Sequence, residues 1–384
     1  MNDEKNRNLN NAQKKCIIIF SGFNQRSIIA FLRTLKKNNL DYVIIAQSEN
    51  DDIFLTDYKC CVLAIRKLVS LNLKDLVGSI KEVQRKHKAD EYIIAPTTEA
   101  LNRFLLQNRE DFENHRCKIP LVDKNLYELI SDKYSFGKLC SQHKILVPKE
   151  VDFNIESKFP FVAKPKNYFS TITGEVLSPV ILNNSYEIEK FLEKNKIKDF
   201  YFQDFINGKS IYLLYYFHRD GTIFKFSQEN LIQQPGGKSM VAAISSNYHN
   251  STESNKYEKL FKGLKFFGFL MVEIKQDHDK NYMIGANPRF WGPSQLFVDS
   301  EINLFEAFLH DFGLINSLRE FKEPLKIVRY FWFGGVCEIL KKNLKLTYHR
   351  NNEDELINLL HEWLKYDIYR RADTKSVFKK ELFQ

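Results

Sequence analysis

Short apolar runs alternate with amphipathic segments along the first part of the chain. Four of these runs have the length of buried strands, at residues 16–20, 42–46, 58–65 and 91–95. Between them, residues 27–37 and 73–86 carry apolar side chains at the spacing of a helix with one buried face. Strands that alternate with helices in this way predict a parallel sheet covered by helices.

The pattern changes near Pro148. Residues 123–146 have helical periodicity, and we expect Pro148 to stop that helix. Strand-like runs then become frequent, at residues 161–163, 200–202, 211–217, 222–226, 269–274 and 282–284. Two of them flank the turn sequence at residues 218–221, which predicts a hairpin. Helices are expected at residues 185–194 and 254–265, so this region is mixed α+β.

The last part of the chain has one amphipathic segment, around residues 353–365. It also contains the aromatic run Tyr330, Phe331, Trp332 and Phe333, which is too apolar to lie in water. We expect this run to pack on the preceding region or on a second subunit. At the other end, residues 1–14 are polar and predict a flexible tail.

Composition adds three constraints. The 384 residues include 57 basic and 48 acidic side chains, a net charge of +9 that favours an anionic ligand or partner. The six cysteines form no C-x-x-C pair, which is typical of free thiols in a reducing compartment. The N-terminus lacks an apolar signal segment, and no stretch approaches the roughly 18 apolar residues of a membrane span. A cytoplasmic protein is the resulting expectation.

The commonest nucleotide-binding loops are absent. Ser21-Gly22-Phe23-Asn24 follows the first apolar run and does not have the G-x-G-x-x-G pattern of dinucleotide-binding folds. A phosphate-binding P-loop needs a glycine five residues before its Gly-Lys-Ser triplet. This chain has two such triplets, and Gln203 and Ile232 stand where the glycine should be. Any nucleotide site must therefore be built in another way.

Four sequence pieces in a fixed order indicate such a site. They are a helix start at residues 131–136, a strand that ends in Lys-Pro at 161–165, a strand that runs into a glycine turn at 201–208, and Val272-Glu273-Ile274 followed by residues 287–292. This ordered set resembles the ATP-grasp superfamily, which includes carbamoyl-phosphate-synthase-like and carboxylate–amine ligase members, over about residues 16–311. The resemblance implies a Rossmann-like domain at 15–122, a two-subdomain ATP-grasp fold at 123–311 and a C-terminal appendage at 312–384.

Basic side chains in these pieces suit a nucleoside triphosphate. Lysines that converge from a helix start and a strand end act as fixed charges on phosphate oxygens. The resemblance gives this role to Lys133 and Lys164, and gives contact with the adenine edge to the linker residues Gln203, Asp204, Phe205 and Ile206. The alternative is two solvated lysines and an ordinary strand end.

The acidic piece predicts a metal site. Glu273 lies inside an apolar run, where an unpaired carboxylate is costly, so a partner is expected. Mg2+ (or Mn2+) held by Glu273 and Asn287 would provide it, because hard cations prefer carboxylate and amide oxygens. A salt bridge is the alternative. Arg289 is the candidate catalytic residue, since it offers a forked donor to a transferring phosphoryl group or acyl phosphate.

One residue differs from the pattern of the ATP-grasp family, and one glycine loop is a candidate substrate site. Gly285 stands where that family usually carries a glutamate that bridges two metals. Strand alternation predicts Met283, Gly285 and Asn287 on one face, so a side chain at 285 would point into the metal site. The loop with Gly236, Gly237, Lys238 and Ser239 is the candidate substrate loop, because paired glycines permit close approach to a ligand. A plain surface turn is its alternative.

These features predict an ATP-dependent carboxylate–amine ligase that works through an acyl phosphate with Mg2+ and takes small-molecule carboxylate and amine substrates. Gly285 keeps open a catalytically impaired ATP-binding protein that senses or scaffolds. A biotin-carboxylase-like activity would need a separate carrier, because the chain has no Met-Lys-Met motif. No membrane partner is expected. Nucleic-acid binding through the basic residues 341–345 is a third alternative, although charge alone does not favour it. A homodimer stays open.

Overall fold

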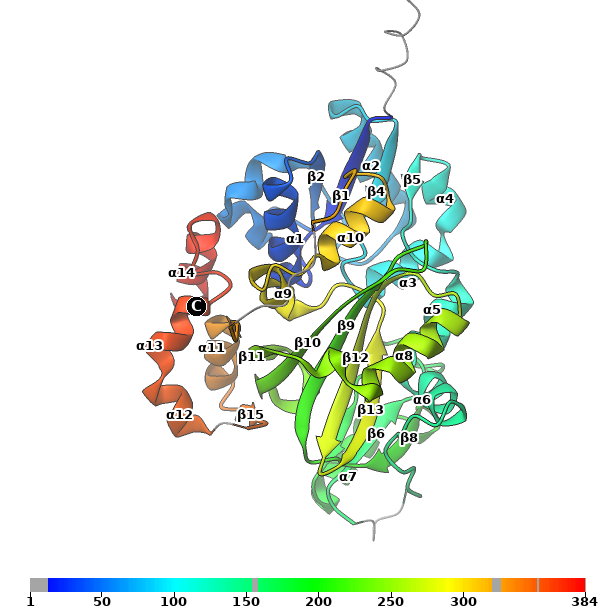
Figure 1. Cartoon of the computed structure of the whole chain (residues 1–384), viewed down its shortest axis with the longest axis vertical. Helices are drawn as coiled ribbons and strands as arrows, with labels where there is room; N and C mark the ends of the chain where they lie inside the picture. The colour runs from blue at the N-terminus through cyan, green and yellow to red at the C-terminus, as the bar shows by residue number, and fades with distance from the viewer. Residues whose placement is uncertain (1–12, 154–157, 320–325, 351, 384) are drawn as a thin grey trace, which may run out of the picture.

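The N-terminal region is a five-stranded parallel sheet. The computed structural model describes residues 13–153, 158–319, 326–350 and 352–383. The strand order is β3–β2–β1–β4–β5 (Figure 1). The strands are β1 (Lys15–Phe20), β2 (Tyr42–Ala46), β3 (Val62–Ile65), β4 (Glu91–Ile94) and β5 (Cys117–Lys118), and the helices α1 (Gln25–Lys37), α2 (Leu73–Lys86), α3 (Glu99–Gln107) and α4 (Arg109–Glu113). The predicted parallel α/β layer is confirmed.

A small antiparallel sheet follows. Its order is β7–β6–β8. The elements of this region are α5 (Lys124–Ser131), α6 (Lys133–Gln142), β6 (Phe161–Pro165), β7 (Val180–Leu182), α7 (Ser185–Lys194) and β8 (Phe200–Asp204). Phe161, Ala163 and Phe202 share an apolar core with residues of α7. Because side chains alternate along a strand, Lys164 and Gln203 lie on the opposite face.

A seven-stranded sheet forms the centre of the lower half of the molecule in Figure 1. Its order is β13–β12–β9–β10–β11–β14, and β15 pairs with β10. Its strands are β9 (Lys209–Phe217), β10 (Ile223–Gln233), β11 (Met240–Ser246), β12 (Gly268–Asp277), β13 (Lys280–Asn287), β14 (Arg329–Phe331) and β15 (Thr347–Tyr348). The predicted hairpin joins β9 to β10, and Gly221 permits its turn with φ of +90°.

The parallel sheet and the seven-stranded sheet share buried cores. Ile18 and Ile94 lie in one apolar cluster with Leu213 and Val272. The helices α8 (Thr252–Gly263), α9 (Gln295–Asp299) and α10 (Leu304–Asp311) complete this part of the fold. Among the described residues, none of the helices combines the length and apolarity that a membrane span requires.

The C-terminal region is docked on both sheets. It contains α11 (Phe333–Lys341), α12 (Glu353–Asn358), α13 (Leu360–Trp363) and α14 (Lys375–Phe383), drawn in orange to red in Figure 1. β14 pairs with β11, so Tyr330 and Phe331 are buried as an edge strand. Arg33 of α1 binds Asp373 through Nε at 2.8 Å and Nη2 at 2.9 Å. The expectation that the aromatic run packs on the preceding region is confirmed.

Four expectations from the sequence are wrong in detail. The single helix at 123–146 is broken at Asp132, whose extended backbone and hydrogen bond to Arg103 (2.6 Å) separate α5 from α6. That region also leaves the helix before Pro148, because Lys144 has a left-handed φ of 58°. Residues 57–61 form a 3₁₀ helix capped by Thr56 instead of starting β3. The helix expected at 353–365 is divided into α12 and α13 at Leu359.

Candidate functional site

The half-buried Lys133 and the buried Lys164 interact electrostatically. Lys133 is the first residue of α6, and Lys164 lies on β6 with 5% exposure. Lys164 Nζ donates to the carbonyl of Ile284 at 3.0 Å. Burial and the positive charge of Lys133 together lower the pKa of Lys164 to about 7, against the opposing effect of Glu273. Because the charge of Lys133 disfavours the charged form of Lys164, a bound anion would stabilise both cations.

Glu273 and Asn287 share one strand face beside these lysines. Glu273 on β12 pairs with Gly285 on β13, and Met271 pairs with Asn287. Asn287 Nδ2 lies 3.8 Å from Met271 Sδ, which places both side chains on the same side of the sheet. The structure thus brings the two predicted metal ligands together from neighbouring strands.

The predicted position of Met283 on that face is wrong. The register shifts between Glu273 and Ile274, so that Ile274 pairs with Met283 and Ile284 is the extra residue of a β-bulge. Met283 consequently points into the opposite core, where it is 2% exposed. The carbonyl of the bulged Ile284 is the one that accepts from Lys164. Strand alternation alone could not show the bulge.

The Glu273 carboxylate lies among cations. Burial raises its pKa, and the charges of Lys275, Lys164 and Lys133 oppose that rise. Among the described residues, none forms a hydrogen bond or ion pair with this carboxylate. The salt bridge considered from the sequence is therefore not formed, and the carboxylate oxygens are free for a ligand.

The space beside Gly285 is bordered by Lys133. A Cβ at this position would lie 3.6 Å from both Cγ and Cε of Lys133, which is ordinary van der Waals contact. Asp277 of the β12–β13 hairpin is not among the groups that shift the pKa of Lys133 or Lys164. Glu273 is the carboxylate that acts on the pKa of Lys164, whereas Asp277 lies at the hairpin end, opposite Lys280.

Arg289 retains an unused donor. Its Nη1 donates to the carbonyl of Phe290 at 2.7 Å, and its buried Nε has no hydrogen-bond partner among the described residues. The charge of Arg289 also contributes to lowering the pKa of Lys133. Phe290 in turn stacks edge-on against Phe31 of the parallel sheet layer at 5.0 Å. The first layer of the fold thus anchors the loop that carries Arg289.

The linker between β8 and β9 begins at a buried amide. Gln203 is 4% exposed and donates from Nε2 to the carbonyl of Pro148 at 3.0 Å. Its Oε1 atom is buried and has no partner within the described part of the chain. The following residues Asp204, Phe205 and Ile206 are exposed or half-buried.

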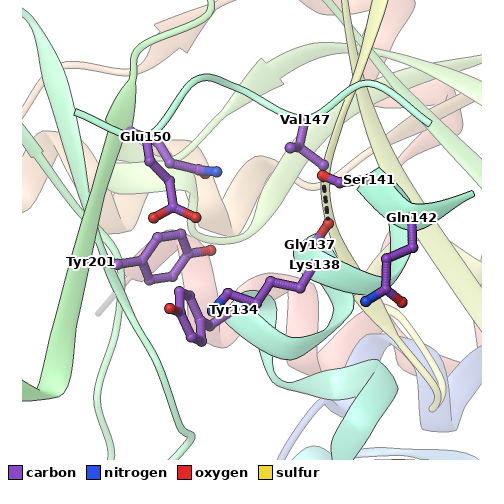
Figure 2. Close-up of a pocket in the computed structure, with 9 residues that line it drawn as sticks. Tyr134, Gly137, Lys138, Ser141, Gln142, Val147, Glu150 and Tyr201 are labelled. Atoms are coloured by element: carbon purple, nitrogen blue, oxygen red, sulfur yellow. Dashed lines mark hydrogen bonds between the residues drawn. The ribbon is translucent and has the colours of Figure 1, made fainter. Parts of the chain in front are cut away.

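A cavity of about 270 Å³ adjoins this amide (Figure 2). Its walls are formed by Tyr134, Gly137, Lys138, Ser141, Gln142, Val147, Glu150, Tyr201 and Gln203. The rings of Tyr134 and Tyr201 lie 5.0 Å apart, and Lys138 Nζ lies 4.1 Å from the Tyr134 ring. Gln203 is the predicted site residue that reaches this cavity, whereas Lys133, Lys164 and Glu273 lie outside it.

The candidate substrate loop is an exposed turn between β10 and β11. Gly236 and Gly237 have positive φ values of 74° and 70°, and Lys238 is also exposed. Gln233 fixes the loop by donating from Nε2 to the carbonyl of Lys238 at 2.9 Å. Within the described ranges, no hydrogen bond joins a side chain of this loop to Lys133, Lys164 or Glu273.

Sequence reasoning missed Glu99, Lys275 and His349. Glu99 of α3 is the acid with the largest effect on the pKa of Lys133. Lys275 follows Glu273 by two residues on β12, so strand alternation could have placed it in the site. His349 contacts Lys275 Nζ at 3.0 Å. It lies near the C-terminus, and no motif links it to the site.

Comparison with solved structures finds the same fold in several enzymes. The biotin carboxylase of Campylobacter jejuni is 14% identical with a TM-score of 0.61, covering 84% of this chain and 76% of that one. The N5-carboxyaminoimidazole synthetase of Staphylococcus aureus is 14% identical with a TM-score of 0.60, covering 86% and 85%. The L-amino acid ligase of Bacillus licheniformis is 13% identical with a TM-score of 0.58, covering 84% and 80%. No family model and no curated protein sequence matches the chain.

Proposed function

We propose, because the chain has the ATP-grasp fold, that it is an ATP-dependent ligase that activates a carboxylate and joins it to an amine. The observation that carries this proposal is the unbalanced charge around Glu273. Lys133 and Lys164 have lowered pKa values, and neither has an acid partner within ion-pair distance in the described residues. A bound polyphosphate would supply the missing negative charge.

The residues present fit one divalent cation. Glu273 offers carboxylate oxygens and Asn287 offers an amide oxygen from the neighbouring strand, which are the ligand types that Mg2+ or Mn2+ prefers. The free Glu273 carboxylate is the observation that supports this fit. When bound, the metal would neutralise developing phosphoryl charge. Gly285 contributes no oxygen, so a second cation would lack a carboxylate ligand from this position.

The adenine base fits the linker end of the site. The unpartnered Oε1 of Gln203 can accept a hydrogen bond from the exocyclic amine of adenine. Backbone groups of residues 204–206 follow it along the chain, from the last residue of β8 into the linker. In this arrangement the base lies at Gln203 and the phosphates extend toward Lys164 and Lys133.

The chain's own residues then hold the reacting groups. The two lysines fix the phosphate oxygens, and a substrate carboxylate oxygen attacks the terminal phosphorus as ADP leaves. Arg289 donates from its unused Nε to the acyl phosphate. The amine attacks the acyl carbon, inorganic phosphate leaves, and the amine loses a proton. No side chain of the protein acts as a nucleophile.

A nucleotide-binding protein with little turnover is the second candidate. Gly285 and the adjacent Lys133 methylenes favour it, because they leave a single carboxylate at the metal position. Binding of ATP without product formation would select this candidate. A screen of phosphate release with ATP, Mg2+, amino acids and small carboxylates separates the two and identifies the substrate class.

The direct test of the site uses thermal stability. Mg-ATP at about 100 times its dissociation constant should stabilise the protein by about 2.7 kcal/mol through mass action. Lys164→Met should remove most of this effect, because a phosphate-binding cation is lost. Lys190→Met on the exposed surface of α7 is the matched control and should respond like wild type. A wild-type protein with no shift at millimolar nucleotide would contradict the site.

A further inference from the structure

A row of hydrogen bonds connects the β12 strand to the candidate substrate loop. Lys275 Nζ lies 3.0 Å from His349 Nδ1, and His349 Nε2 lies 3.0 Å from Gln233 Oε1. Gln233 Nε2 then donates to the carbonyl of Lys238 at 2.9 Å. Four residues from three separate parts of the chain are thus joined end to end.

The chemistry of the row fixes its proton positions. A lysine ammonium has donors and no acceptor, so His349 Nδ1 must accept from Lys275. The ring proton is then on Nε2, which donates to the Gln233 oxygen. Burial and the charge of Lys275 together lower the pKa of His349 to about 3, so the imidazole is neutral near pH 7. Each group in the row therefore donates a hydrogen bond to the next, from Lys275 to the carbonyl of Lys238.

The row ends beside the proposed ligand site. Lys275 lies two residues after Glu273 on the same strand face, and its charge has the largest opposing effect on the raised pKa of Glu273. Lys275 Nζ also lies 3.4 Å from the carbonyl of Gly208 in the linker. The linker packs directly against β12 at this point, and a side chain at 208 would not fit, because its Cβ would lie 2.2 Å from the Gln276 carbonyl oxygen. Of the three ammonium protons, one remains for a ligand.

His349 reaches this position through the docked C-terminal region. It follows β15, whose Tyr348 pairs with Ile232 of β10. The backbone N–H of His349 donates to the Leu231 carbonyl at 2.9 Å. The C-terminal region therefore covers the sheet and also places a side chain against the face that carries Glu273.

We propose that Lys275 is a third lysine that contacts the bound anionic ligand, and that His349 is a positioning residue that holds Lys275 and the substrate loop in register. The inference rests on the proposed function, since it names a further contact of the same site. His349 orients the ammonium through Nδ1 and, through Gln233, fixes the carbonyl of Lys238. One imidazole thereby links nucleotide binding to the position of the loop.

The test measures Mg-ATP affinity and ligand-free stability in the full-length protein. His349→Ala should weaken Mg-ATP binding about tenfold, because Lys275 loses the acceptor that orients its charge. His349→Asn should restore most of the affinity, since its amide oxygen can accept from Lys275. Lys275→Met should weaken binding at least as much, and adding His349→Ala to it should have no further effect.

The control is His361→Ala, an exposed histidine of the same C-terminal region that lies 2.9 Å from Glu362. It should bind Mg-ATP like wild type. If His349→Ala lowers ligand-free stability and leaves affinity unchanged, the row only attaches the C-terminal region and the inference is wrong. If His349→Ala fails to fold, His349→Asn and Lys275→Met decide it: unchanged affinity in Lys275→Met overturns the inference. A wild-type protein that binds no nucleotide overturns the proposed function, and the inference with it.

Discussion

Two buried cations in this molecule differ in how their charge is balanced. Arg66, at the end of β3 in the parallel sheet, lies 3.6 Å from Asp75, and the two side chains are 2% and 4% exposed. The guanidinium of Arg66 also donates to three backbone carbonyls. Lys164 is similarly buried, but its partner is a single carbonyl, and the neighbouring Lys133 makes its charge less favourable.

This difference in charge balance distinguishes a cation with a structural role from one in a binding site. A buried cation beside an acid, with carbonyl acceptors around it, is compatible with folding alone, whereas a buried cation beside another cation lowers stability. Groups that are held at such a cost are found where a ligand balances them. We infer that the parallel sheet uses its charges to fix structure, and that the face of the antiparallel sheets with Lys164 and Glu273 uses its charges to bind.

The largest expected effect comes from deleting all residues after 324. This change removes β14 from the edge of β11 and exposes the buried apolar residues of the seven-stranded sheet. We expect insoluble protein or a strongly lowered unfolding midpoint, measured by soluble yield and thermal denaturation. A soluble truncation with unchanged stability would show that the antiparallel sheet is as independent as the parallel one.

A core substitution in the parallel sheet sharpens the comparison. Ile18→Ala removes a fully buried side chain from β1 and should cost about 3 kcal/mol of unfolding free energy. The Mg-ATP-induced stabilisation should remain, because Ile18 contacts no proposed ligand residue. Lys164→Met should behave in the opposite way, with ligand-free stability kept or increased and the nucleotide response lost. Denaturant titrations with and without Mg-ATP measure the ligand-free stability and the nucleotide response of each variant. If both variants lose both quantities, the separation between structural and binding charges is wrong.

The contrast between the parallel sheet and the binding face also explains which features the sequence could predict. Alternation of apolar runs and helices identifies the parallel sheet, because hydrophobic burial is the main determinant there. The order of motif residues predicts Lys133, Lys164 and Glu273 as site residues, and in the structure these three act on one another's pKa values. His349 could not be predicted, since it enters the site only when the C-terminal region docks on β10. Met283 is misplaced because the bulge at Ile284 depends on pairing with β12, which no local pattern shows.

The smallest expected effect concerns Gly285, where the binding face lacks an acid. The backbone here does not have positive φ, and the nearest atoms to an added Cβ are Lys133 methylenes at 3.6 Å, so a glutamate fits without displacing backbone. Gly285→Glu adds a carboxylate on the face that carries Glu273 and Asn287. It should tighten Mg2+ binding and raise turnover about tenfold, or about 1.4 kcal/mol of transition-state stabilisation.

An ion pair with Lys133 is the competing outcome for this variant. If the new carboxylate binds the Lys133 ammonium, the lysine is withdrawn from phosphate and Mg-ATP affinity falls. Gly285→Gln is the matched control, because it fills the same volume without charge. Phosphate release and Mg-ATP-induced stabilisation across a Mg2+ titration distinguish the cases. A gain with glutamate and none with glutamine would show that the binding face lacks one metal ligand, whereas fast wild-type turnover at low Mg2+ with no gain would show that the face is already complete.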